Sequence, residues 1–150
     1  MTTLKQVEIF TDGACKGNPG PGGWGALLRM GGHEKEMAGG EPATTNNRME
    51  MTAVIRALAE LNQPCAVTLC TDSKYVIDGI TKWVFGWQKK GWVNAKREPV
   101  ANEDLWREML IVIKPHTIEW KWVRGHNGHI ENERVDKLAS DAAVEAQRKR

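Results

Sequence analysis

Three strand-like segments open the chain. Apolar and polar residues alternate over residues 7–12, a second apolar run covers 23–30, and a more polar run follows at about 33–38. A period of two is typical of half-buried strands, and the short links between these runs contain glycine, which favours tight turns. We therefore predict an antiparallel three-stranded meander at the start of the fold.

The hydrophobic period changes to that of a helix over residues 46–61, with Thr44 or Thr45 as the N-cap and Pro64 in the stop signal. The elements predicted after it are a strand at 66–71, a helix near 73–83, an irregular segment to about 100, a helix capped by Asn102, a strand at 117–123, a Gly/His loop and a last helix from about 132.

This order predicts an α/β fold with a mixed five-stranded sheet, in which the meander is extended by two strands that arrive through helices. Helices should cover both faces of the sheet. At 150 residues we expect a single domain over 1–150, with a basic protrusion at about 82–97 and a short charged C-terminal tail at 147–150.

The composition argues against membrane insertion and secretion. The longest apolar runs contain only a few residues, and residues 1–5 lack the apolar core of a signal peptide. The three cysteines, Cys15, Cys65 and Cys70, cannot all pair, and an odd number without a secretion signal indicates reduced thiols. We expect a cytoplasmic protein without a membrane partner.

Glu50 lies on the apolar side of the first predicted helix. A rotation of about 100° per residue from Met49 places Glu50 in the middle of an arc of apolar side chains. A buried carboxylate needs a cation, a hydrogen-bond partner or a metal ion. A Glu50 bonded to nearby backbone or to Arg48 is the alternative to a functional role.

Two aspartates follow apolar strands in the same local pattern, Thr11-Asp12-Gly13 and Thr71-Asp72-Ser73. Strand-end carboxylates beside a helix commonly build a site at the edge of an α/β sheet. Singly, Asp12 and Asp72 could also be turn formers or helix N-caps. Asp136, at the border of the apolar stripe of the last helix, is a fourth candidate, and a solvated helix acid is its alternative.

The four acids suggest oxygen ligation of Mg²⁺ or Mn²⁺. Carboxylates that lie close together repel one another and are neutralised by divalent cations, which can support phosphoryl transfer. His126, in a glycine-flanked loop, is a candidate for mobile proton transfer, with loop packing as the alternative. His126 and His129 form an HxxH pair, but the lack of further soft ligands argues against zinc.

Positive charge and tryptophan are concentrated at residues 82–97. The segment holds no acid and five cations, so the rest of the chain carries three net negative charges within a formal total of +2; the cations are Lys82, Lys89, Lys90, Lys96 and Arg97. Trp83, Trp87 and Trp92 alternate with them, as expected where phosphates are paired and sugars or bases meet flat rings. The alternative is a solvated charged face whose tryptophans pack the protruding helix.

Four tryptophans lie outside this segment. Trp120 and Trp122 alternate on a predicted strand and Trp106 lies on a predicted helix, so we assign these three to packing. The role of Trp24 stays open.

The motifs form an ordered set over nearly the whole chain: Thr11-Asp12-Gly13, Gly17-Asn18-Pro19-Gly20, Thr45-Asn46-Asn47-Arg48-Met49-Glu50, Thr71-Asp72-Ser73, Trp92, Val123-Arg124-Gly125-His126 and Asn132-Glu133-Arg134-Val135-Asp136. This set resembles the type 1 ribonuclease H family, of the bacterial ribonuclease HI kind. The resemblance implies an endonuclease that cuts the RNA strand of RNA-DNA hybrids and leaves 5′-phosphate and 3′-hydroxyl ends.

The resemblance also implies residue roles. The metal-binding acids would be Asp12, Glu50, Asp72 and Asp136, with His126 as the mobile catalytic histidine. Groups that read RNA 2′-hydroxyls would be Asn18, Asn46 and the backbone near Cys15, and Thr45 and Asn102 would belong to a pocket for a DNA-strand phosphate. Further nucleic-acid contacts are expected at Asn47, Lys74, Trp83, Trp87, Lys89, Lys90 and Trp92.

We expect Mg²⁺ as cofactor, replaceable by Mn²⁺, with two ions when substrate is bound. One would orient the attacking water and the other would stabilise the leaving 3′-oxygen. The RNA-DNA hybrid is the expected partner of a monomer with no obligate protein partner. Two alternatives remain: an integrase-like or junction-resolving enzyme that acts on DNA alone, and a catalytically silent hybrid-binding module.

Overall fold

The computed structural model describes residues 4–124 and 129–149. Its elements, in chain order, are β1 (Lys5–Cys15), β2 (Gly20–Met30), β3 (His33–Thr44), α1 (Asn46–Ala59), β4 (Cys65–Thr71), α2 (Lys74–Asp78), the π-helical turn η1 (Gly79–Trp83), α3 (Val84–Lys89), α4 (Glu103–Ile113), β5 (Thr117–Trp122) and α5 (Ile130–Arg148). None of the helices in these residues is long and apolar enough to cross a bilayer.

The five strands form one mixed sheet in the order β3-β2-β1-β4-β5, which confirms the predicted fold class. β1 and β3 each pair with β2 in the antiparallel sense, whereas β4 is parallel to both β1 and β5. The last residues paired between β1 and β4 are Thr11 and Thr71. The register therefore places Asp12 and Asp72 next to each other, just beyond this pair.

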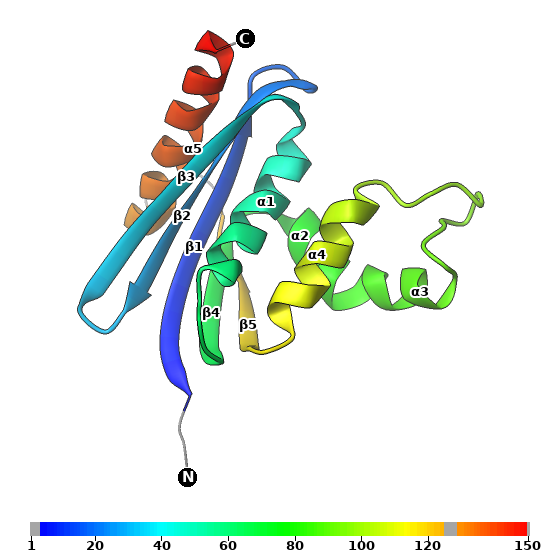
Figure 1. Ribbon diagram of the computed structural model, residues 1–150, viewed down its shortest axis with the longest axis horizontal. Helices are drawn as coiled ribbons and strands as arrows, with labels where there is room; N and C mark the ends of the chain where they lie inside the picture. Colours follow the sequence, from blue (N-terminus) through cyan, green and yellow to red (C-terminus); the bar gives the residue numbers. More distant parts are fainter. Residues whose placement is uncertain (1–3, 125–128, 150) are drawn as a thin grey trace.

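Helices cover both faces of the sheet, with α1 and α4 on one side and α5 on the other (Figure 1). Alternation along β1 decides which residues face which layer, because successive side chains of a strand point to opposite faces. Ile9 belongs to the core on the α1 side, and Phe10 packs with Val135 of α5. Trp24 is buried on the α1 side, so its undecided role is core packing.

Helical structure extends beyond the predicted limit of residue 83, since α3 continues to Lys89 in the segment expected to be irregular. Val84 is fully buried, and the ring of Trp87 lies 5.8 Å from that of Trp106. These long-range contacts stabilise a short helix whose own sequence contains Gly86. β3 also runs further than expected, to Thr44, and α5 reaches Arg148, which shortens the predicted charged tail.

Gly79 allows η1 to pack directly on Trp106. A Cβ atom at residue 79 would overlap the Trp106 ring, and this tryptophan is fully buried. We expect Gly79→Ala to lower the free energy of unfolding by about 1–3 kcal/mol, because overpacking displaces the buried ring. Urea denaturation measures this change. Gly86→Ala is the matched control, since a Cβ there meets nothing within 4 Å and alanine favours the helix; equal losses in both variants would contradict this explanation.

Candidate active site

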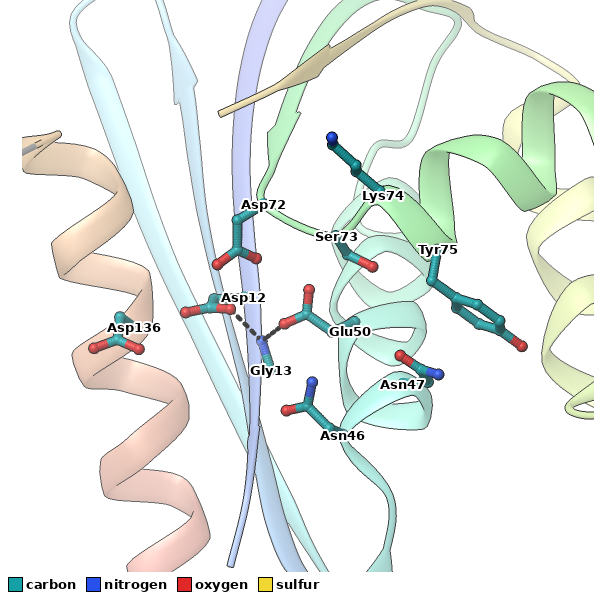
Figure 2. Close-up of a pocket in the computed structure, with 10 residues that line it drawn as sticks. All are labelled: Asp12, Gly13, Asn46, Asn47, Glu50, Asp72, Ser73, Lys74, Tyr75 and Asp136. Carbon is teal, nitrogen blue, oxygen red and sulfur yellow. Dashed lines mark hydrogen bonds between the residues drawn. The ribbon is translucent and has the colours of Figure 1, made fainter. Parts of the chain in front are cut away.

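Three carboxylates meet where the pairing of β1 with β4 ends. Asp12 comes from β1, Asp72 follows β4, and Glu50 comes from the first turns of α1; one oxygen of each lies within 4.8 Å of the others. Their carboxylate groups face one another in Figure 2. Asp12 and Glu50 are only 5% and 4% exposed, whereas Asp72 is half-buried. We call these three residues the acid cluster.

Asp136 faces the acid cluster from α5 (Figure 2). The acid cluster and Asp136 line one pocket, which we call the acid pocket. The oxygens of Asp136 lie outside the group that shares the 4.8 Å limit. The four acids predicted from the sequence are therefore brought to one pocket as a tight group of three and a fourth across from it. Asn46, Asn47 and Lys74 line the pocket as well.

The main-chain N–H of Gly13 donates hydrogen bonds to both buried acids, to Oδ1 of Asp12 at 2.9 Å and to Oε1 of Glu50 (Figure 2). A side chain at residue 13 would overlap the backbone of Met49 and Glu50, so glycine lets α1 approach β1 this closely. Glu50 thus has a backbone hydrogen-bond partner, as expected if its role were only structural. That partner, the Gly13 N–H, is shared with Asp12.

Burial raises the pKa of Asp12 to about 7, and the negative charge of Asp72 contributes to this rise. Burial, followed by the proximity of Asp12, raises the pKa of Glu50 well above its usual range. Within residues 4–124 and 129–149, none of the acid cluster pairs with a lysine or arginine. Arg48, the expected alternative partner of Glu50, pairs with Asp104 at 2.8 Å.

The acid cluster fits a divalent cation. Its donor set consists of carboxylate oxygens, the ligands that Mg²⁺ and Mn²⁺ prefer, and its members destabilise one another while their charge is uncompensated. Asp72 is not a helix N-cap, because Ser73 caps α2 by accepting a hydrogen bond from the N–H of Val76 at 3.1 Å. The carboxylate of Asp72 is therefore available to a ligand.

The residues predicted to read 2′-hydroxyls lie together at the start of α1. Oδ1 of Asn18 accepts a hydrogen bond from the N–H of Asn46 at 3.0 Å. The Cys15 thiol lies beside the same turn and donates to the carbonyl oxygen of Thr44 at 3.4 Å. Because Asn46 and Asn47 also line the acid pocket, these polar groups adjoin the acid cluster.

Thr45 and Asn102, the predicted phosphate pocket, are joined by Arg48. Thr45 caps α1 by accepting from the Arg48 N–H at 3.2 Å, and Nη1 of Arg48 donates to Oδ1 of Asn102 at 3.3 Å. Asn102 occupies the N-cap position of α4 in the left-handed region, with φ 61°, but its side chain does not cap the helix. Its amide instead donates to the Tyr75 hydroxyl at 3.0 Å.

Residues 82–97, which we call the basic segment, form the part of Figure 1 that extends away from the sheet at α3 and the loop after it. Lys89 and Lys90 are exposed there, and Trp83 is 40% exposed. Trp92 is buried with the Arg107 guanidinium 4.7 Å from its ring centre, so packing is favoured for this residue. Trp87 is half-buried between the rings of Trp83 and Trp106.

The assignment of Trp122 to packing is wrong, because the residue is 44% exposed, and its indole contacts Asp72 and Lys74, which line the pocket. Nζ of Lys74 lies 4.4 Å from the Trp122 ring centre. Trp120 packs partly against the core, as predicted. Alternation places both tryptophans on one face of β5, but the sequence pattern does not show where the covering layer ends.

The pocket also contains residues that sequence reasoning did not select, namely Gly13, Ser73 and Tyr75. Gly13 and Ser73 were visible only as the small residues after Asp12 and Asp72, and nothing in the local pattern distinguished Tyr75 from a core aromatic residue. His126, the predicted mobile histidine, lies outside the described residues.

Comparison with known proteins places this geometry in context. Residues 4–144 match the family model described as RNase H. The chain is 73% identical over 143 residues to the Ribonuclease H of Novosphingobium aromaticivorans, and these residues cover 95% of this chain and 100% of that protein. It is 67% identical over 140 residues to the Ribonuclease H of Erythrobacter litoralis, with 93% and 97% of the two chains covered.

Two solved structures have a similar fold. LC9-RNase H1, described as a type 1 RNase H with the type 2 active-site motif, superposes with a TM-score of 0.86 at 38% identity over 97% of this chain and 75% of that one. LC11-RNase H1, solved in complex with an RNA/DNA hybrid, gives a TM-score of 0.67 at 24% identity over 93% and 98% of the two chains, a likeness of fold alone.

Proposed function

Because this chain belongs to the ribonuclease H family and is an endoribonuclease, we propose that it hydrolyses the RNA strand of RNA-DNA hybrids with a divalent metal ion, leaving 5′-phosphate and 3′-hydroxyl ends. The observation that carries this proposal is the acid cluster, which adjoins the polar groups of Asn18, Asn46 and Asn47. A metal-binding group and groups able to contact a ribose are then within reach of the same nucleotide.

Asp12, Glu50, Asp72 and Asp136 would hold Mg²⁺, with Mn²⁺ as a substitute and two ions when substrate is bound. The ions would supply activation of the attacking water and stabilisation of the departing 3′-oxygen. The Gly13 N–H orients the carboxylates of Asp12 and Glu50 toward this pocket. We assign proton transfer at the leaving group to His126, on its family match alone.

The two strands of a hybrid differ at the 2′-hydroxyl, so strand choice needs short polar groups near the site of cleavage. Asn18, Asn46, Asn47 and the backbone near Cys15 suit this purpose. Thr45 and Asn102 both accept a hydrogen bond from Arg48 and suit a phosphate of the DNA strand. Lys74, Trp83 and Trp87 present exposed or half-exposed side chains for further contacts, and Trp92 would act mainly by supporting the basic segment.

The test uses an RNA-DNA hybrid, double-stranded DNA and double-stranded RNA, each labelled on both strands and incubated with Mg²⁺. We expect cleavage of the RNA strand of the hybrid alone, with products that a 5′-phosphate-dependent exonuclease degrades. Cleavage of DNA would support an integrase-like or junction-resolving enzyme instead. Binding of the hybrid without cleavage would support a silent binding module.

The exposed lysines of α3 should contribute to hybrid affinity. We expect Lys89→Gln with Lys90→Gln to raise KM while kcat changes little, and to reduce the slope of log affinity against log salt by about one for each lost phosphate contact. Hybrid binding between low and moderate salt measures the slope. The control pair is Lys114→Gln with Lys149→Gln, which removes the same charge elsewhere; an equal effect of both pairs would contradict a specific contact.

We also propose that the protein is a cytoplasmic monomer, a single domain with a basic protrusion and no membrane or obligate protein partner. All four candidate metal ligands come from one chain, and Cys15, Cys65 and Cys70 are free thiols, as is usual in a reducing compartment. Light scattering of the purified protein would contradict the monomer if it gave twice the chain mass at working concentration.

A further inference from the structure

Trp122 connects the end of β5 to the main chain of Asp72. Its indole N–H donates a hydrogen bond to the carbonyl oxygen of Asp72 at 3.1 Å. Beside this bond, the N–H of Val123, the residue after Trp122, donates to the carbonyl oxygen of Thr71, the residue before Asp72, at 2.9 Å. Since the β4–β5 pairing ends at Thr71 and Trp122, the indole extends the attachment of β5 by one residue, to Asp72 itself.

Asp72 depends on such an attachment more than the other members of the acid cluster do. Asp12 lies within β1 and Glu50 within α1, and both carboxylates accept the Gly13 N–H. Asp72 lies between β4 and α2, and it is half-exposed. Within the described residues its carboxylate takes part in no hydrogen bond, so its direction follows from its main chain.

The indole also contacts the residue that begins α2. The Lys74 ammonium lies 4.4 Å from the Trp122 ring centre, a distance at which a cation is attracted to the face of an indole. The side chain of Trp122 is 44% exposed, so apolar burial alone does not account for a tryptophan here. One ring thus holds the residues on either side of Ser73, at the rim of the acid pocket.

We propose that Trp122 is a positioning residue for Asp72: the indole N–H fixes the Asp72 carbonyl and thereby directs the Asp72 carboxylate toward Asp12 and Glu50. This inference rests on the proposed function of the acid cluster. Groups that orient metal ligands from outside the ligand set commonly change metal affinity and activity by about 10- to 100-fold when they are removed.

Trp122→Phe tests the proposal, because phenylalanine keeps an aromatic ring and removes the N–H. In this folded variant we expect kcat to fall by about tenfold with KM for the hybrid nearly unchanged, and Mg²⁺ to bind the free protein about tenfold more weakly in calorimetric titration. Trp120→Phe is the matched control, since Trp120 lies on the same strand and packs partly on the core. It should keep wild-type kcat and Mg²⁺ affinity.

A second measurement needs no variant. The indole N–H of Trp122 should exchange with solvent more slowly in the wild-type protein than that of Trp83, which is similarly exposed. Equal exchange rates would overturn the proposal, and so would wild-type kcat and Mg²⁺ affinity in Trp122→Phe or equal losses in the two phenylalanine variants. Asp72→Asn separates the two levels of inference: if it cleaves hybrid at the wild-type rate, the proposed role of the acid cluster is what fails.

Discussion

Asp12→Asn is expected to reduce cleavage of RNA-DNA hybrid by about 10³-fold or more while hybrid binding stays largely intact. Asp12 is one of the two buried acids of the cluster, and one of its oxygens lies within 4.8 Å of oxygens of Glu50 and Asp72. Asparagine keeps the size of this side chain while removing the negative charge that would hold a cation. The exposed lysines at 89 and 90 are unaffected by this change, so affinity for the duplex should persist.

Single-turnover cleavage and fluorescence anisotropy with labelled hybrid measure the two quantities separately. Asp141→Asn provides the matched control, because Asp141 is an exposed acid of α5 whose one ion pair within residues 4–124 and 129–149 is with Lys137. It should cleave as the wild type does. Near-normal cleavage by Asp12→Asn would remove Asp12 from the proposed site, and wild-type turnover at full rate in EDTA would refute the metal assignment.

The same substitution should stabilise the metal-free protein at neutral and alkaline pH. Burial raises the pKa of Asp12 from 3.8 to about 7, so the folded state binds this proton more tightly than the unfolded state does. The stabilisation from the protonated group is fully present below pH 4 and is lost as pH rises through about 7. A change of three pKa units corresponds to on the order of 4 kcal/mol, of which Glu50 shares a part.

Urea denaturation in EDTA at pH 5 and pH 8 tests this linkage. The free energy of unfolding of Asp12→Asn should exceed that of the wild type by several kcal/mol at pH 8 and by less at pH 5, since asparagine has no charge to bury. Mg²⁺ should raise the stability of the wild type more than that of the variant, because a ligand stabilises only the state that binds it. A variant less stable than the wild type at pH 8 would contradict the origin assigned to the pKa shift.

Local periodicity was sufficient for most of the fold and for the choice of acids. The alternation at residues 7–12 and the helical period at 46–61 predicted β1 and α1, because strand and helix repeats leave their own spacing in the apolar positions. The same spacing placed Glu50 on the buried face, where a carboxylate needs a partner. The repeated Thr-Asp pattern marked Asp12 and Asp72, whose strands are neighbours in the sheet.

Tertiary structure decided the features that depend on which surfaces meet. Residues 84–89 are helical because Val84 and Trp87 pack against the core, which their own sequence does not reveal. Trp92 is buried although the sequence grouped it with Trp83 and Trp87 as a nucleic-acid contact. Trp122 is exposed although the sequence grouped it with Trp120 as a packing residue. Whether a side chain is covered is set by neighbours remote in the chain, and periodicity reports only the direction in which the side chain points.

For this protein, the sequence by itself determined the order of the strands and of the helices other than α3, which four acids are candidate metal ligands, and the family resemblance, since these follow from residue types and spacing. Only the fold decided that Asp12, Glu50 and Asp72 form a tight group with Asp136 opposite, and that one Gly13 N–H serves two carboxylates. It also placed the Trp122 indole on Asp72. These contacts join residues from separate strands and helices, and they arise from the parallel pairing of β1, β4 and β5 and the close approach of α1 at Gly13.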